Sequence, residues 1–185
     1  MHANGFLMDF ENEILPVGRL TYIGTPLRTN VGSSWRRGGE ADVTLLPAPW
    51  IELGFALTAM RGKITEFTDD EAAVTYHDVD PLLTPRFTSA QRLVLRPSST
   101  LTIGAQGILT SRSQLDNTGN NALTLPGYFV GNLSAEWTRN VYALSLHLNN
   151  VTDTDRYAGG HVSFGEARYY VLPPRSAFLL AKLRL

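Results

Sequence analysis

The last nine residues of the chain alternate between side chains that suit two different solvents. Successive side chains of a strand point to opposite faces, so one face would be apolar while the other carries cations. The apolar set is Ala177, Leu179, Ala181, Leu183 and Leu185, and the cations are Lys182 and Arg184. A charge on the lipid side of a barrel strand costs about 2–4 kcal/mol at the bilayer midplane. The pattern therefore predicts a transmembrane barrel strand with lipid on one side and a wet lumen on the other.

Composition narrows the classes of protein that the chain can be. Its 185 residues carry a formal net charge of -1 and include no cysteine. This length suits one domain, and a near-neutral charge argues against a nucleic-acid partner. The lack of cysteine excludes disulfides, thiolate metal sites and cysteine nucleophiles.

Neither a membrane-spanning helix nor a targeting signal is visible in the sequence. There is no run of 18 apolar residues, and residues 1–5 lack the basic and apolar segments of a secretory signal. An outer-membrane protein requires such a signal. If the barrel interpretation is right, we expect the chain to be the C-terminal piece of a longer protein.

Alternating segments separated by turn residues predict an all-β fold. Three hairpins are expected over residues 39–59, 87–109 and 128–149, after an opening strand at 6–14 and before the terminal strand. Longer connections are expected at residues 15–33, 66–86, 111–125 and 153–174. This alternation of short and long connections indicates an antiparallel transmembrane β-barrel segment of about eight strands, with short periplasmic turns and long extracellular loops.

Several segments resemble the C-terminal barrel of TonB-dependent outer-membrane receptors. The most specific is Asn150-Val151-Thr152-Asp153 followed by Tyr157, and Tyr169-Tyr170 leads through Pro174-Arg175 into the terminal strand. Residues 9–14, 30–32, 37–40 and 125–128 are similar to the same family in the same order. The chain departs from the family at Leu185, where an aromatic residue is usual.

The resemblance implies a receptor fragment covering residues 1–185, without the plug domain and the earlier strands. It implies uptake of a scarce small-molecule ligand such as a ferric siderophore, in the outer membrane of a Gram-negative bacterium. The implied partners are outer-membrane lipid, the barrel-insertion machinery, and TonB through the missing N-terminal part only. No cofactor is implied, and energised uptake by this piece alone is not expected.

Candidate ligand-binding residues fall on the predicted lumen face and on the predicted outer loops. The lumen candidates are Glu40, Asp42, Glu52, His147, Lys182 and Arg184, and the loop candidates are His77 and His161. Lumen side chains set selectivity in such barrels, but salt bridges among them are the simpler interpretation. The acidic residues around His77, namely Asp69, Asp70, Glu71, Asp78 and Asp80, match no calcium-loop spacing, so no metal site is predicted.

Two other interpretations remain open at the level of sequence. The chain could close on itself as a small eight-stranded barrel with a structural or passive pore role. It could also be a soluble β ligand-binding domain, since a β-sandwich would bury the same apolar faces. Catalysis is not expected, because no nucleophile elbow, phosphate-binding loop or paired-histidine zinc motif is present.

Overall fold

A computed structural model of the chain describes residues 1–69 and 72–183, and the regular elements of this part are strands. Within the described residues no helix is long and apolar enough to cross a membrane. The strands are β1 (His2–Leu20), β2 (Pro26–Ala48), β3 (Ile51–Asp69), β4 (Val74–Val79), β5 (Phe87–Ser98), β6 (Leu101–Thr110), β7 (Ser113–Gln114), β8 (Thr124–Leu125), β9 (Tyr128–Arg139), β10 (Tyr142–Asn149), β11 (Tyr157–Ser163), β12 (Glu166–Val171) and β13 (Ser176–Leu183).

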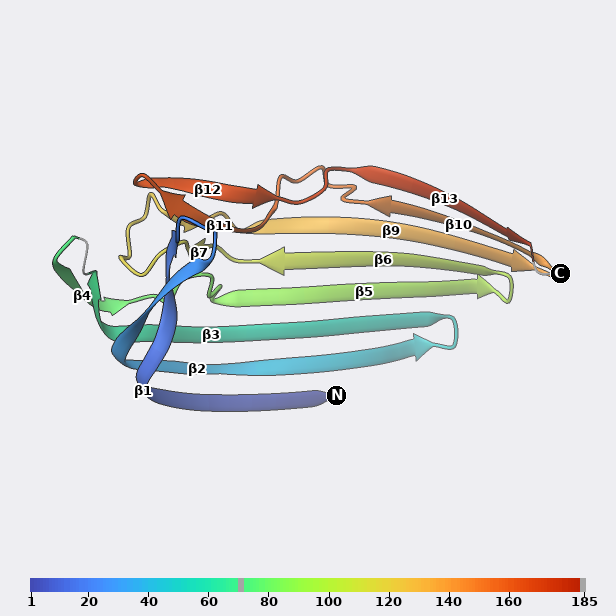
Figure 1. The fold of residues 1–185 in the computed structure, drawn as a ribbon. Helices are drawn as coiled ribbons and strands as arrows, with labels where there is room; N and C mark the ends of the chain where they lie inside the picture. The colour runs from blue at the N-terminus through green and yellow to red at the C-terminus, as the bar shows by residue number, and fades with distance from the viewer. Residues whose placement is uncertain (70–71, 184–185) are drawn as a thin grey trace.

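One large antiparallel sheet dominates the molecule. Its strand order is β1-β2-β3-β5-β6-β9-β10-β13, and β4 pairs separately with β3. Figure 1 shows these strands side by side in one curved sheet, with β1 and β13 at opposite edges. The tight turns β2–β3, β5–β6 and β9–β10 lie at the end near the C-terminus, and the longer connections lie at the other end (Figure 1). The antiparallel all-β prediction is confirmed.

The sheet is open rather than closed into a cylinder. Over residues 1–69 and 72–183, β1 pairs with β2 and β13 pairs with β10, and these two outermost strands do not pair with each other. The structure therefore contradicts the alternative in which the eight strands close into a barrel of their own. An open edge leaves backbone N–H and C=O groups without partners, which is costly in lipid.

Register places the apolar and polar residues of successive strands on opposite faces. Phe55 lies opposite Val43 of β2 and Gln91 of β5, while Leu53 lies opposite Leu45 and Leu93. Near the other edge of the sheet and on the same face, Leu146 of β10 lies opposite Ala135 of β9 and Leu179 of β13. We call this apolar side the outward face and the other side the inward face. Many large apolar side chains of the outward face are exposed, as expected of a wall that faces lipid.

The terminal strand follows this arrangement in part. Ala181 lies opposite Leu144 on the outward face, and Lys182 lies opposite Ala143 on the inward face. Phe178 and Leu180 also occupy the inward face of β13, where they are 59% and 60% exposed. Arg184 and Leu185 lie outside the described residues. β13 is therefore apolar on both faces over much of its length.

The residues that are fully buried gather at the long-connection end of the sheet. One cluster joins Val17, Val31, Ile64, Phe67 and Val79. A second joins Leu115, Leu123 and Val162, with Leu125 and Ala167 packed against it. Nearer the tight turns, none of the described residues of the sheet is buried.

The predicted long connections differ from the structure because several of them contain paired strands. Residues 15–33 continue the β1–β2 ladder to a short turn, where Gly24 has a φ of +81°. Residues 66–86 include the end of β3 and all of β4, and residues 153–174 include the β11–β12 hairpin. Long irregular backbone would leave many peptide groups unpaired, and continuing the strands pairs them. The Gly and Pro residues in these segments had indicated loops instead.

Candidate functional site

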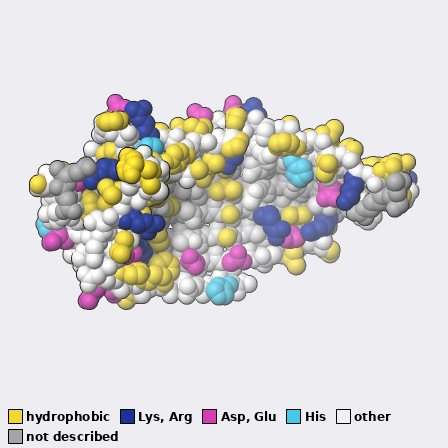
Figure 2. All heavy atoms as spheres, in the orientation of Figure 1, with side chains coloured by type: hydrophobic (Ala, Val, Ile, Leu, Met, Phe, Trp, Pro, Cys, Tyr) yellow, Lys and Arg dark blue, Asp and Glu magenta, His cyan; other side chains and the backbone are white. Residues whose placement is uncertain are grey.

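The inward face carries the polar side chains that could meet a ligand. Figure 2 shows charged side chains of both signs distributed over one face of the sheet, with apolar groups between them. Four successive strands, β2, β3, β5 and β6, contribute one row of side chains, because directly opposed residues share a face: Glu40 lies opposite Thr58, Thr58 opposite Thr88, and Thr88 opposite Thr110. The next row contains His2, Asp42, Ala56, Ala90 and Ile108.

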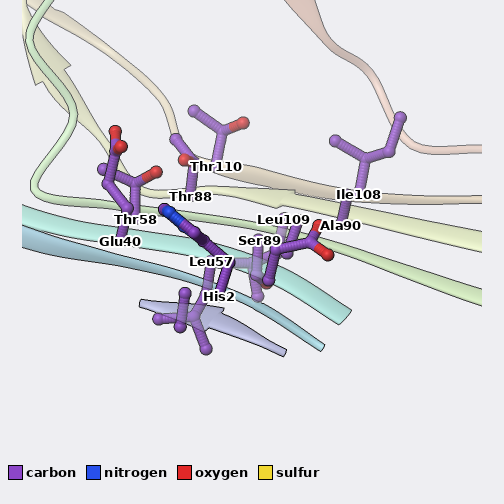
Figure 3. Close-up of a pocket in the computed structure, with 13 residues that line it drawn as sticks. His2, Glu40, Leu57, Thr58, Thr88, Ser89, Ala90, Ile108, Leu109 and Thr110 are labelled. Carbon is purple, nitrogen blue, oxygen red and sulfur yellow. The ribbon is translucent and has the colours of Figure 1, made fainter. Parts of the chain in front are cut away.

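These two rows line a shallow hollow on the inward face. In Figure 3 the side chains of Glu40, Thr58, Thr88 and Thr110 rise from neighbouring strands on one side of the sheet, with His2 beside them. Asp42 also lines the hollow. The two alanines and three threonines leave room above the sheet, so the carboxylates of Glu40 and Asp42 can accept hydrogen bonds from a bound molecule. The structure thus brings two sequence-predicted candidates together.

Glu52 has a different environment, because it is already neutralised. Its carboxylate pairs with the guanidinium of Arg92 and, at 3.0 Å, with that of Arg96. The three side chains come from β3 and β5 on the inward face, and the group holds one positive charge in excess. This arrangement matches the interpretation in which lumen charges form salt bridges with one another.

His147 lies beside this charged group, in a second hollow. Its neighbours across the sheet are Ser134 and Phe178. The hollow is lined also by Arg92, Gly104 and Gln106, and the small Gly104 and Ser134 create the space. Lys182 of β13 is exposed on the inward face as well, nearer the tight turns. Arg184 lies outside the described residues. The structure therefore distributes the lumen candidates over at least three places rather than one pocket.

The two loop candidates lie at the other end of the molecule. His77, on β4, is exposed, and its Nδ1 lies 3.9 Å from Oε2 of Glu66. His161, on β11, has its Nδ1 3.0 Å from the hydroxyl of Tyr170 on β12, with the two rings stacked 5.6 Å apart. Each histidine thus has a local partner within its own hairpin.

Sequence reasoning missed a polar junction that ties the long connections together. Asn117 is fully buried, its Nδ2 donates to the carbonyl of Pro16 (2.8 Å), and the amide of Leu82 donates to its Oδ1 (3.0 Å). Three segments far apart in sequence therefore meet at one side chain. We call residues 113–125 with Asn117 at their centre the loop junction. The only local signal was the Asp-Asn-Thr-Gly-Asn run, which is typical of a turn.

Two carboxylates at this end have shifted pKa values. Burial raises the pKa of Asp116, although its Oδ1 accepts hydrogen bonds from both the amide and the hydroxyl of Thr118. Partial burial would also raise the pKa of Asp80, but hydrogen bonds from Lys63 (2.8 Å) and Arg86 (2.7 Å) outweigh it and lower the pKa.

The hollows of the inward face and the long-connection end can bind molecules by hydrogen bonds and by charge. Across residues 1–69 and 72–183 no group of three or more His, Asp or Glu side chains is placed to hold a metal ion. Asp70 and Glu71, which belong to the predicted acidic cluster, lie outside the described residues.

A curved antiparallel sheet with an apolar outward face, a polar inward face, and tight turns at one end is the wall of a transmembrane β-barrel. Residues 1–151 match the family described as "TonB dependent receptor-like, beta-barrel". The chain therefore belongs to the TonB-dependent receptor family through its barrel domain. Members of this family are outer-membrane receptors and transporters of Gram-negative bacteria, not enzymes.

Solved structures show the same fold. The ferric yersiniabactin uptake receptor FyuA of Yersinia pestis is similar with a TM-score of 0.75 and 17% identity, over 98% of this chain and 27% of that one. The siderophore receptor PiuA of Acinetobacter baumannii gives a TM-score of 0.73 and 17% identity, over 98% and 25%. The ferric citrate transporter FecA gives 0.71 and 15%, over 98% and 28%.

These matches also give the extent of the chain relative to known structures. The chain spans about a quarter of the length of each of these receptors. No match is found among curated proteins.

Proposed function

We propose that this chain is the C-terminal part of the barrel wall of an outer-membrane TonB-dependent receptor, which takes up a scarce small molecule such as a ferric siderophore. The family match over residues 1–151 carries the proposal. The opposed apolar and polar faces of the sheet support it, because a barrel wall in lipid requires both. TonB would be contacted by a part of the protein that precedes this chain.

In this proposal the inward face lines the path of the ligand. Glu40 and Asp42 would accept hydrogen bonds in the hollow of Figure 3, and His147 and Lys182 would lie nearer the tight turns. Glu52 would hold Arg92 and Arg96 in place rather than bind the ligand directly. His77 and His161 are proposed for the ligand-facing end.

Uptake by the complete protein that carries this chain tests the proposal. Cells are starved of iron, and accumulation of radiolabelled iron is followed with a panel of ferric siderophores, with and without TonB. We expect accumulation of at least one chelate that is lost without TonB. Equal accumulation in cells lacking the gene, across the whole panel, would contradict uptake of a ferric siderophore.

The inward carboxylates provide a sharper test of the ligand path. The double variant E40Q/D42N removes both charges from the hollow with little change in size. We expect the affinity for the transported chelate to change about tenfold, since a hydrogen bond to a charged group contributes about 1.5–3 kcal/mol. The matched control D9N/E11Q removes two carboxylates from the outward side of β1 and should leave the affinity unchanged. Equal effects of the two double variants would contradict the assignment.

A further inference from the structure

Two arginines face each other directly on the outward side of the sheet. Arg37 of β2 lies opposite Arg61 of β3, and both are exposed. Between them and the tight turn, the outward positions of both strands are uncharged. These positions are Gly39, Ala41, Val43 and Leu45 on β2, and Ile51, Leu53, Phe55, Leu57 and Ala59 on β3. On these two strands the arginine pair is therefore the first outward charge met when moving from the tight-turn end.

The position of the pair matches the height of a bilayer. Ten residue steps separate Ile51 from Arg61. At a rise of about 3.3 Å per residue and a tilt of about 40°, this stretch spans about 25 Å along the membrane normal. The apolar band of an outer-membrane barrel has about the same height. With Ile51 at the periplasmic border of the hydrocarbon, as the proposed function requires, the two guanidinium groups would lie at the opposite border, at the level of lipid head groups.

Within residues 1–69 and 72–183, neither arginine is neutralised by a carboxylate. Among the described residues, Arg37 and Arg61 form no ion pair, whereas the neighbouring Lys63 and Arg86 are both paired with Asp80. Asp9, an acid on the adjacent strand β1, lies opposite Trp35 and pairs with neither guanidinium. Like charges placed directly opposite across two strands destabilise a sheet. An anion between the two guanidinium groups would remove that repulsion.

The surroundings of the pair favour a lipid over a free anion. Arg37 lies over the ring of Trp35, 4.8 Å from its centroid, and tryptophan is enriched where a membrane meets water. On the tight-turn side, Gly39 and Ala59 lie opposite each other and leave a shallow surface that an acyl chain could cover. Guanidinium groups bind phosphate oxygens in a bidentate manner, so the chemistry of the pair suits a phosphate group.

We propose that Arg37 and Arg61, beside Trp35, bind the phosphate of a phosphorylated lipid in the outer leaflet, with its acyl chain over Gly39 and Ala59. This inference rests on the proposed function, because it requires the outward face to meet a membrane and the tight turns to lie on the periplasmic side. It adds a lipid site on the outside of the barrel that is independent of any ligand in the lumen.

Lipid binding by the complete protein in detergent tests the site. The protein is titrated with bis-phosphorylated lipid A, and retained lipid is counted by native mass spectrometry. The double variant R37Q/R61Q should bind about thirtyfold more weakly, which corresponds to about 1 kcal/mol for each arginine near a membrane surface. The matched double variant R28Q/R112Q, which removes two exposed arginines farther toward the long-connection end, should bind like the unaltered protein. Unchanged binding by R37Q/R61Q would overturn the proposal.

Two further measurements separate the possible failures. Displacement of the lipid by millimolar inorganic phosphate alone would assign the pair to a free anion and overturn the lipid site. Uptake of the ferric chelate is followed with the same variants, and it should be unchanged in R37Q/R61Q. If uptake is normal while lipid binding is unaffected by the substitutions, the lipid site fails and the receptor function stands. If the protein is absent from the outer membrane, both proposals fail.

Discussion

At the scale of single residues, Asn117 joins three segments of the long-connection end through one buried side chain. It holds the carbonyl of Pro16 and the amide of Leu82, two backbone groups from other segments. The sequence could not have indicated this role, because the three segments are brought together only by the folded sheet. A fully buried amide with partners of both kinds is stabilising only while all of its hydrogen bonds are satisfied.

Replacing Asn117 by Ala should loosen the loop junction without unfolding the sheet. Two backbone groups would lose their partners, at a cost of about 1–3 kcal/mol for each group that stays buried. We expect amides at residues 113–125 to exchange hydrogen markedly faster, while those of β5 and β6 are unaffected. The exposed Asn121, replaced by Ala, serves as control. Unchanged exchange in N117A would show that the junction does not depend on this side chain.

Asp116 should make the same junction sensitive to pH. Its pKa is raised by burial, so the folded chain holds the proton more tightly than the unfolded chain does. Its contribution to stability is therefore most favourable at low pH and declines as the pH rises through the raised folded pKa. D116N stays neutral and can still accept from Thr118.

Hydrogen exchange at two pH values checks this expectation. At pH 7 the amides of residues 113–125 should be better protected in D116N than in the unaltered chain, and near pH 3 the difference should vanish. A difference of the same size at both pH values would mean that the charge of Asp116 is not its cause.

At the scale of elements, alternation along the strands was the most reliable signal in the sequence. The hairpin over residues 39–59 was predicted because apolar and acidic residues alternate there, and its register does place Val43 against Phe55 and Asp42 against Ala56. The strand ends could not be predicted in the same way. Beyond Arg61 the strands leave the apolar band, so alternation no longer reports which face meets lipid, and Gly and Pro residues suggested loops.

The distinction between the two faces predicts unequal effects of the same substitution on β10. L146R places a cation on the outward face, opposite Ala135 and Leu179, and should destabilise the complete barrel by about 2–4 kcal/mol. S145R places it on the inward face, where we expect less than about 1 kcal/mol. Urea unfolding in lipid vesicles, followed by tryptophan fluorescence, measures both. A larger loss for S145R would reverse our assignment of the faces.

At the scale of the whole molecule, the open edges of β1 and β13 are the dominant feature. An edge in lipid leaves peptide groups unpaired, each at a cost of several kcal/mol. The alternation of strands could be predicted from sequence, but whether they close could not, because closure depends on the curvature of the sheet and on the pairing of its two edges.

The open sheet predicts that the chain should not form a stable monomeric barrel alone. We expect the isolated 185 residues in detergent to lack heat-modifiable migration on a gel, which folded barrels show. Co-refolding with the remainder of the receptor should restore it. Heat-modifiable migration of the isolated chain as a monomer would show that it can close, against the arrangement described here.

The location of the buried clusters determines which residues of the long-connection end can be substituted without damage to the structure. The long connections are held together by Phe67, Leu115 and Asn117, so substitution of these residues would deform several hairpins at once. Tyr22 and Phe164, at the hairpin tips, project fully into solvent and touch little. Substitutions at the tips could therefore abolish recognition by an antibody or a bacteriophage with little loss of stability. Substitutions in the buried clusters beneath the tips would do so only by damaging the structure.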